Sequence, residues 1–448
     1  VRFARIWRRW VMGSNAITTI IGEHLLIRNG KSSPSRAITG EYPVYGSNGI
    51  IGYSDEYNAN ENTIIIGRVG SYCGSVYISG KKCWVTDNAI IGTAKNENES
   101  HFWFYLLKKI DLNNYSTGSG QPLINQTIIN TISVTIPKLS EKRVAIGHFL
   151  RHFDQKINLS LNINQSLEQM SQTLFKSWFV DFDPVIDNAL DAGNPIPEAM
   201  QSRAELRQKV RNSADFKPLL AEIRSLFPSE FEETEPGWLP KGWKHGNLND
   251  VTKILSGFAF KSKDFGDEGK SVIKIKNINI DKTIDIDHTQ KISDIVAKDV
   301  KRFQLFDADI LMAMTGATVG KFGILASKNH EEYYLNQRVA KFETDKKAYL
   351  YCILNQESTE RFIINTAQGS AQPNISAKDI LSIPLTLPSN EIITIFNTFV
   401  DPLFYRMIAN TKVSLSLTEL RDTLLPKLIS GELSLEDLPD LSTNTEAA

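Results

Sequence analysis

Two short glycine–lysine segments are the first places where this sequence could bind a phosphate. A nucleotide-binding loop needs G-x-x-x-x-G-K-[ST], because its glycines let backbone N–H groups wrap the phosphates. Gly30, Lys31 and Ser32 supply the end of this pattern. Leu25, however, stands where the first glycine is required, and "GATVGKF" has Phe322 in place of the hydroxyl residue. Neither segment meets the pattern, so nucleotide hydrolysis is not expected.

Histidine and aspartate pairs are the next candidates for chemistry. His148 and His152 lie four residues apart, a spacing that could hold a metal on one face of a helix. They flank apolar positions, which favours plain helix-surface or seam histidines. Asp181 and Asp183 could act as an acid pair, but the adjacent Pro184 favours a helix end and a capping role. The sequence has no HExxH and no close cysteine pair, so no metal site is expected.

Other catalytic motifs are absent as well. The segments "GSVYISG" (74–80) and "GSAQPNIS" (369–376) lack the G-x-S-x-G spacing of a nucleophile elbow. The sequence has no dinucleotide-binding GxGxxG. It also lacks an acidic or asparagine residue followed by Pro-Pro and an aromatic, the hallmark of adenine methyltransferases. The chain is therefore expected to be non-catalytic.

An internal repeat organises the elements that carry these residues. Gln121 and Pro122 recur 251 residues later as Gln372 and Pro373, and Pro137 recurs as Pro388 at the same distance. Such a register indicates a duplication, which has to be identified before a fold is assigned. The same distance separates Ile129, Ile132, Phe153, Ile157, Leu174 and Lys176 from Ile380, Ile383, Phe404, Ile408, Leu425 and Lys427.

Composition is that of an ordinary globular protein. The 448 residues are 41% hydrophobic and 23% charged, enough for about two to four domains. A net charge of −1 argues against a general polybasic nucleic-acid binder but leaves room for local basic surfaces. Cys73, Cys83 and Cys352 are too few for a disulfide framework, which indicates a reducing cytoplasm. No run of about 18 apolar residues occurs, so no membrane span is expected.

The first eleven residues, "VRFARIWRRWV", carry four arginines and lack the apolar core of a signal peptide. A basic amphipathic helix for a membrane surface is one interpretation. We favour Met12 over Val1 as the true start and begin the domain description there.

Two β-rich segments alternate with two long amphipathic ones. Residues 12–140 and 240–390 contain short apolar runs separated by Gly, Asn and Ser, a pattern typical of β-rich domains. Residues 141–239 combine a long helix with a connector, and residues 391–433 form a second long helix. The acidic tail, residues 434–448, is expected to be disordered.

The two long segments have apolar residues at steps of three or four, which places a stripe on one helix face. Ser160, Asn164, Asn410 and Thr411 interrupt the stripes and predict local polar layers. Two such stripes would aggregate in water, so we expect the helices to bury them against each other in an antiparallel pair. The expected seam comprises Ile146, Leu150, Phe153, Ile157, Leu167, Leu174, Phe396, Leu403, Met407, Leu417, Leu424 and Leu428. The stripes also include Met170, Trp178 and Leu420.

The expected fold is thus mixed α/β (α+β), with two β-rich heads, two long antiparallel, coiled-coil-like helices and a pseudo-two-fold internal repeat. Two similar heads could present two recognition surfaces to duplex DNA, whose half-sites match a two-fold protein. Candidate DNA-binding residues in the first segment are Lys31, Ser32, Arg36, Tyr45, Asn48, Arg68, Tyr72 and Lys82. Those in the second are Lys261, Lys263, Lys270, Lys274, Lys276, Asn277, Thr315, Thr318 and Lys321.

Several phrases carry a resemblance to a known family. These are "YPVYGSNGIIGY" (42–53), "IIIGRVGSYCGSVY" (64–77), "CWVTDNAI" (83–90), "GSGQPLIN" (118–125), "SWFVDFDPV" (177–185) and "LPKGW" (239–243). Together with the repeated Gln-Pro-x-Ile and the long helix after "IPKL" or "LPSN", they resemble the specificity (S) subunit of type I restriction–modification systems. The resemblance covers residues 12–433.

This resemblance implies a non-catalytic subunit that selects a bipartite double-stranded DNA target with a non-specific spacer. Each head would be a target-recognition domain, and the helices would set the spacer and dock the methyltransferases. The implied partners are two adenine-methylating modification subunits and ATP-dependent restriction subunits. S-adenosylmethionine, ATP and magnesium would belong to those partners, and this chain would hold no cofactor.

Two other interpretations remain. The chain could be a non-catalytic coiled-coil scaffold or adhesin with two β-rich protein-binding heads. A methyltransferase fused to its own recognition domain is a third possibility, but the missing catalytic and cofactor motifs oppose it.

Overall fold

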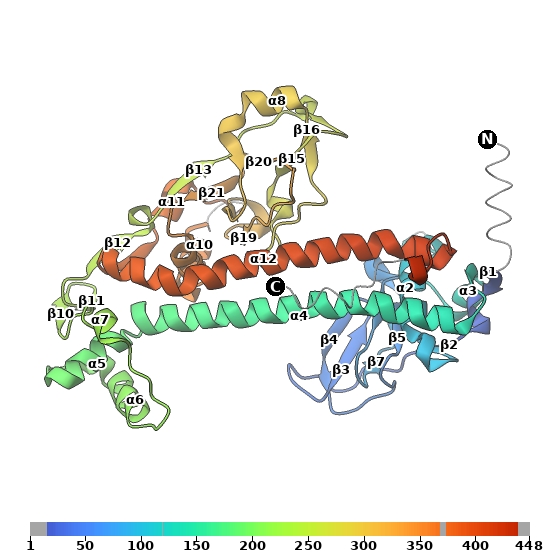
Figure 1. Ribbon diagram of the computed structural model, residues 1–448, viewed down its shortest axis with the longest axis horizontal. Coiled ribbons are helices and arrows are strands. Elements are labelled where there is room, and N and C mark those ends of the chain that lie inside the picture. The colour runs from blue at the N-terminus through green and yellow to red at the C-terminus, as the bar shows by residue number, and fades with distance from the viewer. Residues whose placement is uncertain (1–15, 119, 368–372, 438–448) are drawn as a thin grey trace. The chain divides into compact units, whose positions relative to one another are not determined.

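The computed structural model describes residues 16–118, 120–367 and 373–437, and the chain divides into two compact units. Unit 1 comprises Val1–Asn158 and Leu415–Ala448, and unit 2 comprises Leu159–Ser414. Each unit holds one β-rich head and a part of each of two long helices, α4 (Ser140–Phe179) and α12 (Asn390–Ser430) (Figure 1). The prediction of a mixed fold with two β-rich domains and long helices is confirmed.

The head of unit 1, residues 16–137, is called the first head. It contains a four-stranded sheet in the order β2-β8-β5-β6, a three-stranded sheet β4-β3-β7, and the pair β1-β9. Its strands are β1 (Ala16–Ile20), β2 (Leu25–Asn29), β3 (Tyr42–Gly46), β4 (Gly49–Ser54), β5 (Ile64–Gly67), β6 (Val76–Ile78), β7 (Trp84–Val85), β8 (Ala89–Ala94) and β9 (Ser133–Pro137). Its helices are η1 (Ile21–Glu23), η2 (Gly70–Tyr72), η3 (Glu97–Glu99), α2 (Ser100–Ile110), η4 (Leu112–Tyr115) and α3 (Gln126–Thr131).

The head of unit 2, residues 244–387, is called the second head. Its sheets are β13-β21-β18-β19, β14-β16-β15-β20-β17 and β12-β22. Its strands are β12 (Lys244–Asn247), β13 (Lys253–Ser256), β14 (Phe265–Gly266), β15 (Lys270–Ile273), β16 (Gln290–Ile292), β17 (Gln304–Leu305), β18 (Ile310–Ala313), β19 (Phe322–Ile324), β20 (Tyr333–Leu335), β21 (Val339–Glu343) and β22 (Pro384–Leu387). Its helices are η6 (Leu248–Asp250), η7 (Ser262–Asp264), η8 (Ile275–Asn277), α8 (Asp294–Asp299), η9 (Lys301–Phe303), η10 (Gly316–Thr318), α9 (Lys347–Leu354), α10 (Glu357–Ala367) and α11 (Ala377–Leu381).

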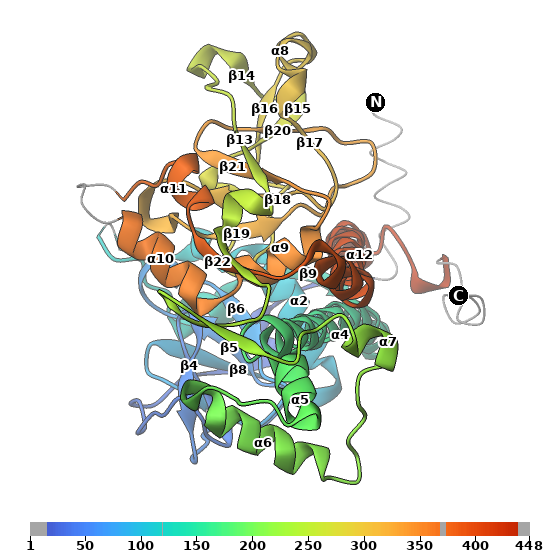
Figure 2. The same ribbon diagram turned by 90° about the vertical axis from the view of Figure 1, so that its left-hand side faces the viewer.

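The two heads share one strand topology. Strands β2, β8, β5 and β6 of the first head correspond in order to β13, β21, β18 and β19 of the second. The parallel pair β3-β7 corresponds to β15-β20, and the closing antiparallel pair β1-β9 to β12-β22. The second head has additional elements, and Figure 2 shows α8, β14 and β16 at the end of unit 2 farthest from α5 and α6. This correspondence agrees with the duplication in the sequence.

In unit 1 the two long helices pack through an apolar cluster with a polar edge. Ile146 and Leu150 of α4 share a buried cluster with Leu425 and Leu428 of α12 and with the first head. At its edge Asp154 accepts a hydrogen bond from the Tyr105 hydroxyl at 2.5 Å and forms an ion pair with Arg421 of α12. One carboxylate thus ties the head to both helices.

In unit 2 the same helices pack around a polar layer. Asn410 Nδ2 donates to Asn164 Oδ1 at 2.9 Å, and Asn164 Nδ2 donates to the Met407 carbonyl at 3.0 Å and to Thr411 Oγ1 at 3.3 Å. The polar layer predicted at these positions is confirmed. Beyond it, Trp178 of α4 packs edge-on against Phe396 of α12.

The helices run antiparallel in one register in both units. The residue numbers of contacting partners add up to 575 for Asp154 and Arg421, and to 574 for Asn164 and Asn410. Leu420 is exposed and was wrongly assigned to the stripe, as was Met170. All twelve expected seam residues are buried or partly buried: Ile146, Leu150, Phe153, Ile157, Leu167, Leu174, Phe396, Leu403, Met407, Leu417, Leu424 and Leu428.

Helix α12 is apolar enough to meet the length and composition criteria for a membrane span, although the sequence has no unbroken apolar run. Its apolar side chains have partners within the protein, because Phe396 and Phe404 are buried against Tyr349 and Tyr351 of the second head. A core helix meets the same criteria, and these contacts favour that interpretation.

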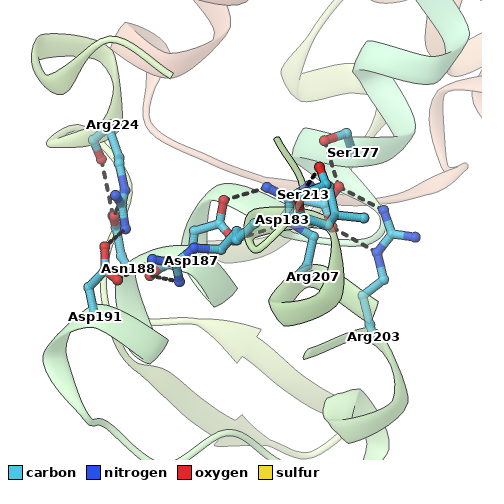
Figure 3. A network of polar contacts seen from close by, with 11 residues as sticks. Ser177, Asp183, Asp187, Asn188, Asp191, Arg203, Arg207, Ser213 and Arg224 are labelled. Carbon is cyan, nitrogen blue, oxygen red and sulfur yellow. Dashed lines mark hydrogen bonds and ion pairs between the residues drawn. The ribbon is translucent and has the colours of Figure 1, made fainter. Parts of the chain in front are cut away.

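The connector between the first long helix and the second head is a helical insert closed by a ladder of aspartate–arginine pairs (Figure 3). It comprises α5 (Asp183–Ala192), η5 (Glu198–Met200), α6 (Gln201–Arg211), α7 (Ala221–Arg224), β10 (Phe231–Thr234) and β11 (Gly237–Pro240). The expected helix at "QSRAELRQKV" is α6.

The ladder follows from helical spacing. Asp183, Asp187 and Asp191 lie four residues apart on α5 and face three arginines with the same spacing on α6. Arg203 donates to both carboxylate oxygens of Asp183 at 2.7 Å, a bidentate geometry that favours planar guanidinium groups. Asp183 therefore forms an ion pair and does not cap α5, which corrects the capping prediction.

The acidic tail is partly ordered. Leu435–Asp437 form the 3-10 helix η11, and Leu433 and Leu435 pack against the core of unit 1. The expectation of disorder from residue 434 is therefore wrong for residues 434–437, and the remainder of the tail lies outside the described residues.

The ladder allows a graded test. Asp187 and Arg207 are mostly buried, whereas Asp191 is about half exposed at 47% of its side chain. We expect Asp187→Asn to lower the free energy of unfolding by about 1–3 kcal/mol, because a charge-assisted hydrogen bond is lost in a shielded place. The matched Asp191→Asn should lower it by less than about 1 kcal/mol, since solvent screens exposed pairs. Urea denaturation of the full chain measures both, and equal effects would contradict the ladder's burial gradient.

Candidate nucleic-acid interface

A tightly bonded junction in the first head joins the end of β5, the turn before β8 and the Gln-Pro-x-Ile segment. The Arg68 N–H donates to the Asn88 carbonyl at 3.0 Å, and the Arg68 carbonyl accepts from the Ile124 N–H at 3.0 Å. The Gly70 N–H donates to the Pro122 carbonyl at 3.1 Å. These backbone bonds explain the first copy of the repeated phrase, because it closes the loop that begins at Arg68.

The second head has the same junction. The Met314 N–H donates to the Arg338 carbonyl at 3.0 Å, and the Met314 carbonyl accepts from the Ile375 N–H at 3.0 Å. The Gly316 N–H donates to the Pro373 carbonyl at 2.9 Å. Gln372 itself lies outside the described residues. The bonds use only backbone atoms, so the junction can persist while its side chains change.

Glycines make the junction possible on two sides. Gly70 and Gly316 have φ values of 75° and 79°, a left-handed conformation that other residues rarely adopt. Gly30 and Gly257 lie so close to the turn that an added Cβ would meet the Thr86 carbonyl oxygen at 2.0 Å or the Asn336 carbonyl oxygen at 2.2 Å. The turn is therefore held from both sides in each head.

A hollow lies beside the same loop in each head. In the first head it has a volume of about 840 Å³ and is lined by Asn48, Ser71, Tyr77 and Lys108 among others. In the second head it has a volume of about 370 Å³ and includes Lys321. Polar and apolar groups thus border the junction in both heads, which suits contacts to a mixed polar surface such as nucleic acid.

Most sequence candidates of the first head are at the surface. Arg68 is half-buried, and its Nη1 donates to the Asp87 carbonyl at 3.3 Å. Lys82 lies over the Tyr57 ring, 4.4 Å from its centroid. The exposed candidates are Lys31, Ser32, Arg36, Asn48, Tyr72 and Lys82.

Candidates of the second head divide into exposed and engaged cations. Lys270 bonds Glu332 at 3.0 Å, and this hydrogen bond raises the pKa of its ammonium group. Lys274 lies 3.8 Å from the Phe265 ring centroid, and burial lowers its pKa. Both are thus held by their own head. Lys261, Lys263 and Lys276 are exposed, and Thr318 and Lys321 are half-buried.

Three candidates are buried and need correction. Asn277 is only 1% exposed, and its Nδ2 donates to the carbonyls of Asp285 and His288, so its amide shapes a loop instead of facing a ligand. Tyr45 belongs to a buried cluster of the first head. Thr315 is 8% exposed and bridges Asn374 through its backbone. Sequence reasoning overrated them because polar residue type does not reveal burial.

Sequence reasoning also missed two exposed residues at the junction. Asn88 and Arg338 occupy equivalent places, each being the last residue of the turn before β8 or β21. Asn88 and Arg338 are 250 residues apart, so the 251-residue offset of the sequence repeat does not align them. The shared hydrogen bonds reveal that the two positions are equivalent.

Within the described part of the chain no group of three or more His, Cys, Asp or Glu residues could hold a metal ion. His148 and His152 are both exposed, and His152 Nδ1 is bonded to the His148 carbonyl at 2.8 Å. They are helix-surface histidines, as favoured from the sequence.

Comparisons with known proteins identify what the chain resembles. Residues 21–169 and 240–413 match the family described as type I restriction modification DNA specificity domain. The type I restriction enzyme HindI specificity subunit of Haemophilus influenzae is 30% identical over 331 residues, covering 70% of this chain and 71% of that relative. The MjaIX specificity subunit of Methanocaldococcus jannaschii is 24% identical, covering 76% and 70%.

One solved structure has the same fold. The S subunit of a type I restriction–modification system from M. genitalium has a TM-score of 0.55 at 16% identity, covering 93% of this chain and 96% of that one.

The correction at Asn277 can be tested by a neighbour comparison. We expect Asn277→Ala to lower the free energy of unfolding by about 1–3 kcal/mol, because the buried amide that bonds the carbonyls of Asp285 and His288 is lost. Lys276→Ala removes an exposed side chain on the same 3-10 helix and should change the free energy by less than about 0.5 kcal/mol. Thermal or urea denaturation distinguishes the two, and a harmless Asn277→Ala would contradict the structural role.

Proposed function

Because the chain belongs to the type I restriction–modification DNA specificity family, we propose that its two heads read the two halves of one bipartite DNA target. The observation that carries this proposal is the repeated junction. One backbone framework occurs once in each head, and the side chains mounted on it differ. Two readers of the same build with different side chains suit two different half-sites on one duplex.

The chain itself performs no chemistry in this proposal. Its sequence lacks the motifs for methyl transfer and nucleotide hydrolysis. Methylation with S-adenosylmethionine and ATP- and magnesium-dependent cleavage would belong to modification and restriction subunits. The chain would bring those partners to a chosen DNA sequence in the cytoplasm, where its three buried free cysteines suit a reducing environment.

The long helices are proposed to dock two modification subunits. Several apolar side chains on these helices remain exposed although the seam is buried. Leu159 and Met170 of α4 are 59% and 57% exposed, and Val413 of α12 is 51% exposed. Apolar residues left at the surface on a helix pair can be covered by a partner. A duplicated chain with pseudo-two-fold symmetry would offer two such places, one for each copy of the partner.

Helix length is proposed to set the spacer between the half-sites. Antiparallel packing keeps one register in both units, and the hydrogen bond between half-buried Asn164 and buried Asn410 favours that register over shifted ones. A coiled-coil-like pair of fixed register has a fixed length, which would determine how far apart the heads read.

The bipartite reading is tested by exchanging one head. Residues 244–387 are replaced by the corresponding head of a relative with another target, with junctions at the paired strands β12 and β22. Methylome sequencing of cells that also contain the modification subunits should show one half of the methylated sequence changed. The other half and the spacer should remain. An unchanged motif would favour the alternative, a scaffold with protein-binding heads.

The spacer proposal is tested by shortening both helices in register. Residues 155–161 of α4 and 413–419 of α12 lie between the Asp154–Arg421 and Asn164–Asn410 contacts and form a matched pair of heptads in the observed register. Both register-setting polar contacts are kept when they are removed. Deleting both removes about 10 Å of helix, since the rise is about 1.5 Å per residue. The preferred spacer should shorten by roughly three base pairs, because the duplex rises about 3.4 Å per base pair. Both half-sites should be retained.

A deletion in α4 alone is the control, since it breaks the register and should reduce methylation without defining a new spacer. If the paired deletion is methylated with the original spacer, helix length does not set it.

A further inference from the structure

The turn before β8 and its counterpart before β21 are exposed features that several backbone hydrogen bonds hold in place. Asp87 and Asn88 form the first turn, and Gln337 and Arg338 form the second, all four exposed. Each turn is closed by its own backbone bond, from Ala89 to Thr86 at 3.0 Å and from Val339 to Asn336 at 2.9 Å.

Three neighbouring segments anchor each turn. The carbonyl of Asn88 or Arg338 accepts from the end of β5 or β18, as described for the junction. The residue before each turn bonds a neighbouring strand: the Thr86 N–H donates to the Tyr45 carbonyl of β3 at 2.9 Å, and the Asn336 N–H donates to the Ile273 carbonyl of β15 at 3.1 Å. Gly30 or Gly257 packs against the other side. A side chain on such a base is preorganised, which reduces the entropy lost on binding.

The side chains at this position take no part in holding the fold. Among the described residues neither the Arg338 guanidinium nor the Asn88 amide has a hydrogen-bond or ion-pair partner. An exposed arginine or asparagine on a rigid turn keeps its full set of donors for a ligand.

The surroundings of the first turn suit a nucleic acid. Arg68 extends beside it and uses one of its guanidinium nitrogens on the Asp87 carbonyl, at 3.3 Å from Nη1. Lys31 pairs through its backbone with Thr86, and its exposed side chain can contact a phosphate. Lys31 and Arg68 therefore flank a turn that carries Asp87 and the uncharged Asn88. Of these two, only Asn88 has an amide that can both donate to and accept from a base edge.

We propose that the position shared by Asn88 and Arg338 reads a base pair in each half-site, with Asn88 binding adenine and Arg338 binding guanine. The chemistry follows from geometry in the major groove. An asparagine amide pairs with N6 and N7 of adenine, and an arginine fork pairs with O6 and N7 of guanine. This assignment rests on the proposed function of the heads and names, for each, one residue that determines specificity.

The test uses the full chain assembled with its modification subunits and reads the methylated motif by methylome sequencing. Arg338→Asn should remove the preference for guanine at one position of one half-site, by roughly ten- to a hundredfold relative to the other bases. Asn88→Arg should change one position in the other half-site. The spacer and all other positions should be unchanged.

Two further variants separate base reading from charge. Arg338→Lys keeps the charge but loses the planar fork. Its preference for guanine should fall below that of arginine without disappearing, since an ammonium group can also donate to O6 and N7. Arg302→Asn removes an exposed charge elsewhere in the second head, on η9, and should leave the motif intact. Thermal unfolding shows whether each variant folds, and Asn88→Arg tests the position independently of Arg338.

Arg338→Asn and Asn88→Arg complexes that methylate the wild-type motif, at any uniform rate, would overturn the proposal, since that is the behaviour of a phosphate contact. These outcomes are distinct from failure of the proposed function, in which the unaltered complex would show no bipartite motif.

Discussion

Antiparallel pairing of α4 and α12 is the constraint on which the rest of the structure depends. Each compact unit is built on a stretch of both helices, so neither head has a complete core without the pair. Apolar stripes drive the pairing, but apolar contacts alone permit shifted registers. The Asn164–Asn410 bond and the Asp154–Arg421 ion pair penalise such shifts, because a shift would leave the buried Asn410 and the largely shielded Arg421 without their partners. A few polar side chains within an apolar seam thus determine the register in which the two helices pair.

Each head is attached to the helices through polar contacts that are also shielded. In unit 1 Glu99 of the first head accepts two hydrogen bonds from Arg143 of α4, at 2.8 and 2.9 Å. Burial by itself would raise the pKa of the Glu99 carboxyl. Hydrogen bonds from Arg143, Ser140 and Trp103 outweigh that effect and lower the pKa. In unit 2 Glu168 of α4 accepts from Asn355 at 2.6 Å and pairs with Lys282. A charged group buried with its partner is costly to separate. The heads are therefore fixed on their helices, as the proposed reading of two half-sites requires.

Sequence periodicity foresaw the long helices well, because a stripe of residues such as Leu150, Phe396 and Leu428 directly reflects burial on one face. Even the polar layer at Asn164 was foreseen, since a polar residue within an apolar stripe stands out. The candidate interface was harder to predict. Asn277 looked like a surface reader and proved to be a buried loop brace, whereas Arg338 was overlooked. Asn277 bonds carbonyls 8 and 11 residues away in a folded-back loop, and Arg338 is held by the backbone of Met314 at the end of another strand. Residue type and spacing do not encode either contact.

The duplicated junction shows how a reader can diverge without losing its fold. The same hydrogen bond joins the Gly70 N–H to the Pro122 carbonyl in one head and the Gly316 N–H to the Pro373 carbonyl in the other. No side-chain atom takes part in it. Substitutions at exposed positions of the turn therefore leave the framework intact, and measured surface substitutions usually change stability by less than about 0.5 kcal/mol. The backbone of Arg68 bonds that of Asn88 in one head, and the backbone of Met314 bonds that of Arg338 in the other. Each head thus has one arginine at this shared contact, but on opposite sides of it. A framework held by backbone atoms separates the stability of a head from its choice of DNA sequence, which lets each half of the target change independently.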